Sequence, residues 1–211
     1  MPKPSPDHPL ASLRRLSDTQ TMRALAHPVR ISLIELLVID GPLTATEAAE
    51  RLGESPTTCS FHLRQLARYG FVEEAGMGPG RNRPWKITSA GMTMDMEGAD
   101  PATDLAAQAL QRMFRDRHLS RLQAWRDTRA TYPKPWRDLA SENQYVLWVT
   151  PDELEQMEIE LAAVLMRYQA RLTDRGSRPE GSRAVEVLQF IFPVDMESLG
   201  LLGSPGHPGS S

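Results

Sequence analysis

The chain is poor in cysteine, in aromatic residues and in long apolar runs. Cys59 is the only cysteine among 211 residues, which excludes an internal disulfide and a zinc site built from several thiolates. No stretch approaches the roughly 18 uninterrupted apolar residues that a membrane-spanning helix needs. Residues 1–15 also lack the apolar segment of a secretory signal. We therefore expect a cytoplasmic protein that has no membrane partner and gains its stability from packing.

Basic residues are concentrated in one part of the chain. The net charge of −3 excludes a uniformly basic surface. The segment Ser55–Lys86 nevertheless has five basic and two acidic residues, whereas the chain from Met92 onward has thirteen basic and eighteen acidic residues. A polyanion such as a phosphate backbone would therefore bind this segment rather than the C-terminal half.

Composition predicts two folded parts between two tails. Residues 1–13 are rich in proline, and residues 199–211 are rich in glycine, proline and serine, so both are expected to be flexible. The acidic string EGADP at 97–101 separates an N-terminal domain, residues 14–96, from a C-terminal domain, residues 101–196.

Capping residues predict four helices before residue 70. Thr44 and Glu47 have the spacing of a capping box, and Ser55 before Pro56 is a typical helix start. Glycines follow the third and fourth helices, where they commonly end helices. The predicted ranges are 22–26, 28–40, 45–52 and 56–69.

A hairpin is predicted directly after the fourth helix. Residues 71–75 and 84–88 have the character of short strands, and the glycine-rich, basic loop GMGPGRNR lies between them. Helices, a turn and a basic hairpin in this order make a winged helix-turn-helix. We expect Trp85 to pack the hairpin onto the helices.

The fourth helix has the features of a DNA-reading helix. Cys59, Leu63 and Leu66 fall on one face, which we expect to pack against the preceding helices. The opposite face offers small hydroxyls near the helix N-terminus, one aromatic ring and two arginines, and such side chains can bond phosphates and base edges in a major groove. The alternative is a solvated surface helix. The candidate DNA contacts are Ser55, Thr57, Thr58, Ser60, Phe61, Arg64 and Arg68 on this helix, and Arg81, Asn82 and Arg83 on the hairpin.

Several motifs in order resemble those of the ArsR-type winged-helix regulators of bacteria. They are ALAHPVRISLIELL, TATEAAERLG, SPTTCSFHLRQLARYGFV and RPWKIT, and they cover about 75 residues. The resemblance implies a dimeric repressor or activator. It also implies that the helix Pro56–Tyr69 enters the major groove while the wing, residues 76–83, contacts the flanking backbone.

The metal-binding patterns of that family are incomplete in this chain. The segment LTATEAAERLG lacks the paired cysteines of the thiolate-type sensors. Asp116 and His118 supply half of the other familiar site, but Thr128 and Thr131 stand where its second half would be. We expect no metal site unless the partner chain adds ligands to Asp116 and His118. A redox switch at Cys59 is an alternative to an inert, buried thiol.

The C-terminal half is predicted to be a dimerisation domain of helix, strand, helix and strand. The expected elements are a long amphipathic helix at 102–129, a strand at 145–149, a helix from 151 to about 175 and a strand at 185–194. The whole fold is therefore expected to be mainly α with a small β component, an N-terminal winged helix-turn-helix followed by a C-terminal α+β domain. Aromatic residues of this half could line an effector pocket or, alternatively, fill a core and dimer interface: Trp125, Trp136, Tyr145 and Trp148.

These features together predict a homodimeric, sequence-specific transcription regulator that binds an operator in double-stranded DNA. We expect a repressor rather than an activator, no cofactor and an unidentified small-molecule effector. One alternative is an enzyme of methyltransferase type that uses the winged helix only for dimerisation. The roughly 110 residues after Pro101 lack a glycine-rich strand-turn-helix and any evident catalytic constellation, so no enzyme is expected. Another alternative is an effector-free architectural protein.

Overall fold

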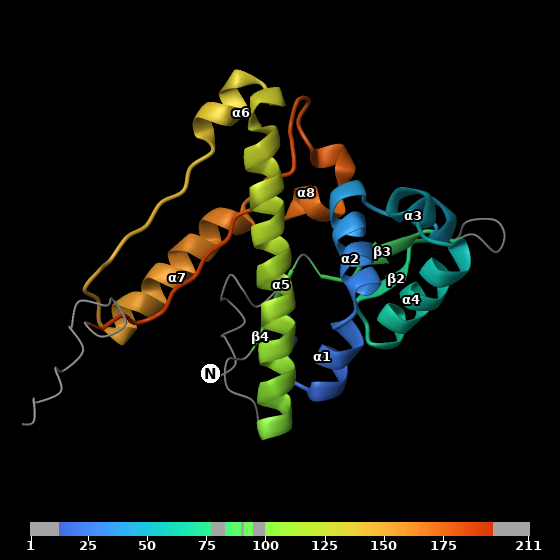
Figure 1. Cartoon of the computed structure of the whole chain (residues 1–211), viewed down its shortest axis with the longest axis horizontal. Helices are drawn as coiled ribbons and strands as arrows, with labels where there is room; N and C mark the ends of the chain where they lie inside the picture. Colours follow the sequence, from blue (N-terminus) through green and yellow to red (C-terminus); the bar gives the residue numbers. More distant parts are fainter. Residues whose placement is uncertain (1–12, 77–82, 90, 95–99, 196–211) are drawn as a thin grey trace, which may run out of the picture.

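The computed structural model describes residues 13–76, 83–89, 91–94 and 100–195 (Figure 1). It confirms a mainly helical fold with a small β component and an N-terminal helix-turn-helix. The elements are β1 (Arg14–Leu16), α1 (Thr19–Leu25), α2 (Pro28–Asp40), α3 (Ala45–Leu52), α4 (Pro56–Arg68), β2 (Val72–Glu74), β3 (Trp85–Ile87), β4 (Met92–Met94), α5 (Pro101–Thr128), a 3₁₀ turn (Arg129–Thr131), α6 (Lys134–Leu139), α7 (Pro151–Met166), α8 (Ala170–Thr173) and a second 3₁₀ turn (Arg175–Ser177).

Local capping explains why α3 begins and ends where the sequence predicts. The Thr44 hydroxyl accepts a hydrogen bond from the Glu47 amide at 3.2 Å, and the Glu47 carboxylate accepts one from the Thr44 amide at 2.8 Å. These bonds hold the pKa of Glu47 below its usual value. Gly53 then ends the helix with a φ of +68°, a backbone conformation that side chains disfavour.

The predicted hairpin is confirmed and is bonded to the helical core. Strands β2 and β3 are antiparallel, with Val72 opposite Ile87. The backbone of Trp85 also exchanges two hydrogen bonds with that of Leu43, at 2.7 and 3.1 Å. The Trp85 side chain packs against the core, as expected, and its backbone holds the base of the hairpin to Leu43, two residues before α3.

A second, parallel strand pair was not predicted. Strand β1 pairs with β4, placing Arg14 opposite Met92 and Leu16 opposite Met94. Leu16 is fully buried in the core. Each of these strands has only three residues, too few to show a pattern in the sequence.

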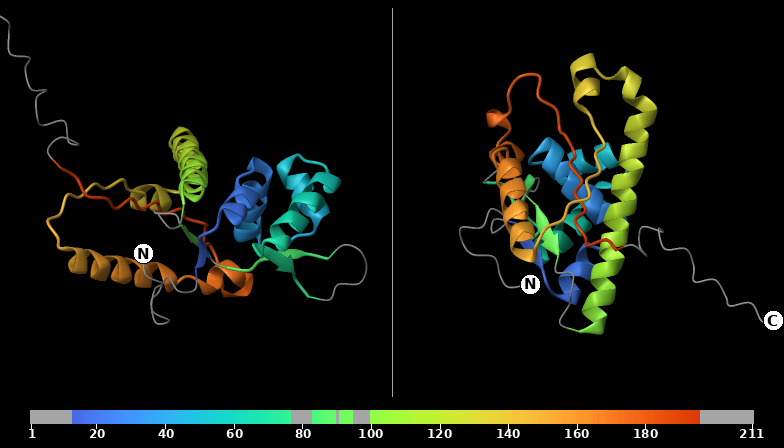
Figure 2. Two further views of the ribbon diagram at one scale, coloured as in Figure 1. Left: turned by 90° about the horizontal axis from the view of Figure 1, so that it is seen from below. Right: turned by 90° about the vertical axis from the view of Figure 1, so that its left-hand side faces the viewer.

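The long helix α5 spans the molecule without a break. It is 28 residues long and packs against α1 through Thr103, Ala107 and Leu110, all buried. The hydroxyls of Thr19 and Thr103 lie 2.7 Å apart. Figure 1 shows α2 between α5 and the pair α3 and α4, and Figure 2 shows that α7 lies in a different layer from α5.

The two strands predicted for the C-terminal half are wrong for the single chain. Residues 145–149 and 185–194 are extended but form no strand (Figure 2). A strand exists only beside a hydrogen-bonded neighbour, and within the described ranges neither run has one. The second C-terminal helix is also shorter than predicted, because α7 ends at Met166 and a turn separates it from α8. None of the helices among the described residues is long and apolar enough to cross a membrane.

Candidate nucleic-acid interface

Helix α4 begins at a cap that fixes its direction. The Ser55 hydroxyl accepts a hydrogen bond from the Thr58 amide at 3.0 Å, and its oxygen lies 2.8 Å from the Thr58 hydroxyl. Pro56 occupies the first position, where no amide hydrogen is needed. The positive end of the helix dipole and the remaining free amides therefore lie together at an exposed end, where they favour an anion such as phosphate.

The two faces of α4 differ as the sequence predicts. The inner face packs against α2 and α3 through Cys59, Leu63 and Leu66, all fully buried. On the outer face Phe61 is 55% exposed, and Arg64 and Arg68 are exposed beside it. The remaining candidate contacts divide between exposed Ser55 and Thr57 and half-buried Thr58 and Ser60. This surface combines donors, two cations and an aromatic ring, which is what reading base edges and phosphates requires.

A pair of histidines packs between α2 and α4. His27 caps α2, with its Nδ1 accepting from the Val29 amide at 3.2 Å, and its ring centroid lies 4.4 Å from that of His62. Burial first, and then the electrostatic influence of His27 and Arg30, lower the pKa of His62. This environment favours the neutral form of the His62 ring, which is buried in the core. Burial also raises the pKa of the Cys59 thiol, which favours the inert form of that side chain.

Arg14 from β1 holds the C-terminal end of α4. Its guanidinium donates to the carbonyl oxygens of Tyr69 and Gly70 and lies 4.3 Å from the centre of the Phe71 ring. Both carbonyls belong to the residues directly after the last turn of α4, where a bound cation also suits the negative end of the helix dipole. The orientation of α4 is thus fixed at both ends. Nothing in the sequence around α4 pointed to Arg14.

Acidic residues neutralise the base of the wing. Arg83 donates to the Glu74 carboxylate at 2.7 Å, and Lys86 lies 3.0 Å from Glu73. These pairs cross the antiparallel strands β2 and β3. A phosphate would therefore compete with Glu74 for Arg83. The other two predicted wing contacts, Arg81 and Asn82, lie outside the described residues.

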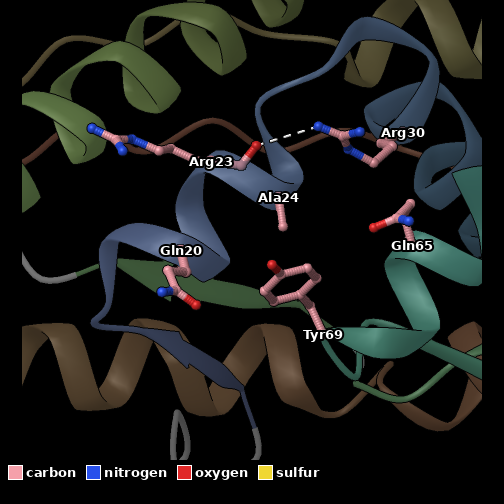
Figure 3. Close-up of a pocket in the computed structure, with 6 residues that line it drawn as sticks. All are labelled: Gln20, Arg23, Ala24, Arg30, Gln65 and Tyr69. Carbon is pink, nitrogen blue, oxygen red and sulfur yellow. Dashed lines mark hydrogen bonds between the residues drawn. The ribbon is translucent and has the colours of Figure 1, made fainter.

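A polar hollow opens beside the end of α4 (Figure 3). Its volume is about 290 Å³, and it lies between α1, α2 and α4. Arg30 crosses its rim and donates to the backbone carbonyl of Arg23 at 3.3 Å, while burial lowers the pKa of Arg30. The lining residues are Gln20, Arg23, Ala24, Arg30, Gln65 and Tyr69.

The predicted effector residues do not converge in the single chain. Trp125 and Trp136 are half-buried, and Arg129 lies over the Trp125 ring at 5.6 Å. Tyr145 is 78% exposed and Trp148 is completely exposed, so these two side chains do not line a cavity in the single chain. The effector pocket stays a prediction.

The histidine of the metal half-site faces a carboxylate of the same chain instead. His118 Nδ1 lies 2.8 Å from the Glu186 carboxylate, and Asp116 is exposed to solvent. Within the described ranges no three histidine, cysteine, aspartate or glutamate side chains are grouped so that they could hold a metal ion.

Two arginines of α5 connect the two halves of the chain. Glu35 of α2 accepts hydrogen bonds from Arg117 and Arg121 of α5, at 2.7 and 2.5 Å. Arg117 also donates to the Ser32 hydroxyl at 2.8 Å. Arg121 in turn bonds both carboxylate oxygens of Glu186, at the start of the second extended run. Helix α2 is therefore bonded to α5, and α5 to the run 185–194.

Comparison with known proteins assigns the N-terminal part. A family model described as a helix-turn-helix domain matches residues 25–75, which contain α2, α3, α4 and β2. Among solved structures the chain is similar to reduced HlyU from Vibrio cholerae N16961, with 19% identity, coverage of 46% of this chain and 88% of that chain, and a TM-score of 0.29. None of the curated proteins matches the chain. Residues 25–75 are therefore a helix-turn-helix domain, the kind of domain with which transcription regulators bind DNA.

Proposed function

We propose that the protein is a homodimeric, sequence-specific repressor of the ArsR type and not an enzyme. The observation that carries the proposal is the outer face of α4, which presents Phe61, Arg64 and Arg68 to solvent on a helix fixed at both ends. A recognition helix needs this rigidity because base contacts depend on side-chain placement.

Each candidate side chain has a distinct role on the DNA. Arg64, at the centre of the exposed face, forks onto a guanine edge in the major groove. Ser55 and Thr57, beside the free amides at the start of α4, bond a phosphate. Arg68 and the wing arginine Arg83 bond flanking phosphates and set the register of the protein on the duplex.

The spacing of operator half-sites favours a dimer, and occupancy of a promoter by that dimer would repress transcription. One helix reads only a few base pairs, whereas two related by a two-fold axis read half-sites about 34 to 36 Å apart. A dimer bound over a promoter occupies the DNA that polymerase needs. We propose that an effector bound in the aromatic C-terminal half releases it.

DNA binding by the full chain tests the proposal. Fluorescence anisotropy measures affinity for DNA from the upstream region of the protein's own gene and for a scrambled duplex, over a range of salt concentrations. The alanine variant Arg64→Ala should lose about 1 to 3 kcal/mol at the specific site and little on scrambled DNA. The control Arg112→Ala removes the same charge from an exposed position on α5 and should bind like the wild type. Equal affinity of the wild type for both duplexes at physiological salt would overturn the proposal.

A further inference from the structure

The C-terminal half exposes more apolar surface than a folded domain normally leaves in water. In the first extended run, residues 145–149, the Trp148 side chain is completely exposed. In the second, residues 185–194, Phe190 and Phe192 are 60% and 68% exposed. Scattered apolar residues are ordinary on a surface, but runs of consecutive exposed aromatic and branched side chains are typical of an interaction site.

The backbone of these runs is unpaired as well. Within the described ranges, no amide or carbonyl of 145–149 or 185–194 takes part in a backbone hydrogen bond. Both runs consist mainly of aromatic and branched residues, which favour strands. They therefore have the sequence and the shape of strands and lack only a neighbouring strand.

Helix α7 contributes an apolar stripe to the same half. Leu161, Val164 and Leu165 follow the spacing of one face of α7, and Tyr168 lies in the turn directly after it. Each of the four is between 39% and 54% exposed. A stripe of this kind normally packs on a sheet or on another helix. In the single chain it is only partly covered.

The run 185–194 is anchored at its beginning. Glu186, its one charged residue, is bonded to Arg121 and His118 of α5. The remainder is uncharged, so two copies of the run meet without like-charge repulsion. Pro193 lacks an amide hydrogen and limits pairing to residues 185–192.

We propose that the C-terminal half completes its fold only with a second copy of the chain. The run 185–192 pairs antiparallel with the same run of the second copy across a two-fold axis, and the α7 stripes of both copies cover the resulting sheet. The inference rests on the homodimer of the proposed function and names its interface.

Surface area and symmetry favour a second copy over another occupant. A fully exposed aromatic side chain offers about 150 to 250 Å² for burial, so Tyr145, Trp148, Phe190 and Phe192 together offer roughly 450 to 750 Å². The aliphatic side chains of the two runs and of α7 add to this, which brings the patch to the roughly 800 Å² per partner of a stable interface. A two-fold axis places identical strands antiparallel without any further requirement.

Two matched aspartate variants test where the copies meet. Phe192→Asp charges the second run, and Leu105→Asp charges an equally exposed leucine on α5, so neither disturbs the core of the single chain. Light scattering after size exclusion should give dimers for the wild type and Leu105→Asp, and monomers for Phe192→Asp. The helical part of the circular dichroism spectrum of Phe192→Asp should be unchanged, because every helix is formed within the single chain. A monomeric wild type, or a dimer lost in Leu105→Asp and kept in Phe192→Asp, would overturn the inference.

Cysteine cross-linking then tests the antiparallel pairing. The chain is suited to it because its single native cysteine, Cys59, is fully buried. Single cysteines placed at 187, 188 and 189 should form intermolecular disulfides most readily at the position nearest the two-fold axis, where paired Cα atoms lie within about 6 Å. Absence of cross-links at all three positions in a stable dimer would refute the pairing. Failure of the DNA-binding proposal would leave both results unchanged, so the two failures are distinguishable.

Discussion

Replacing Glu35 with alanine tests how the helix-turn-helix is held to the rest of the chain. The Glu35 side chain is only 21% exposed and lies 2.6 Å from Arg117 and 2.5 Å from Arg121. Exposed ion pairs contribute about 0.2 to 1 kcal/mol, and removing one partner of a fully buried pair costs about 3 to 5 kcal/mol. Both arginines are more than a third exposed, so we expect Glu35→Ala to lower the free energy of unfolding by about 1 to 2.5 kcal/mol.

The expected loss of stability includes the repulsion between Arg117 and Arg121, which the Glu35 carboxylate normally offsets. Arg117 and Arg121 are four residues apart on α5 and therefore face each other on the helix surface. For a chain of this length the change corresponds to a fall in melting temperature of about 2 to 10 °C. Scanning calorimetry at low salt measures it, and the difference should shrink in 1 M salt, where charges are screened within about 3 Å.

The control is Glu155→Ala on α7, an exposed glutamate with the same change of charge. It should melt within about 1 °C of the wild type, because exposed substitutions of this kind change stability little. Equal melting temperatures for the two variants at low salt would show that the reasoning about Glu35 is wrong.

Three further predictions concern the DNA-binding half. Glu74→Gln frees Arg83 and removes a negative charge from the wing, so the affinity for DNA at low salt should rise. A DNA-binding titration identical to that of the wild type would contradict a phosphate contact by Arg83. The pKa of His62 is lowered in the folded state, so below about pH 6.5 the unfolded chain binds more protons than the folded chain. The free energy of unfolding should therefore fall as the pH drops. Urea unfolding between pH 7.5 and 5 measures this fall, which should be shallower for His62→Gln than for the wild type. Arg14→Ala should increase hydrogen exchange at the C-terminal end of α4 and weaken specific DNA binding, and exchange equal to that of the wild type would argue against the cap.

Features encoded within a few residues could be predicted from the sequence. The capping box of Thr44 and Glu47 is one example, and the cap formed by Ser55 is another, because the partners lie three residues apart. The outer face of α4 follows in the same way from helical spacing, once Cys59, Leu63 and Leu66 identify the inner face.

Features that depend on distant segments could not be predicted. Strands β1 and β4 are too short to show alternation, and their pairing is set by the fold of everything between them. At 145–149 and 185–194 the residue pattern predicted strands that the single chain does not form, because a run of strand-favouring residues does not say whether a neighbouring strand is present. The partners of Arg83 and His118 likewise come from other elements, Glu74 and Glu186.

Because Arg14 bonds the carbonyls of Tyr69 and Gly70, the smallest complete DNA-binding unit is longer than the helix-turn-helix alone. The helix-turn-helix match ends at residue 75 and begins at residue 25, but the guanidinium that satisfies the end of α4 comes from a strand 56 positions before Gly70. That strand is itself held by β4, beyond the wing. A fragment trimmed to residues 25–75 would keep every candidate DNA contact of α4 and lose the group that holds the two residues directly after the helix. Fragments intended for DNA-binding studies should therefore extend at least from Leu13 through Met94.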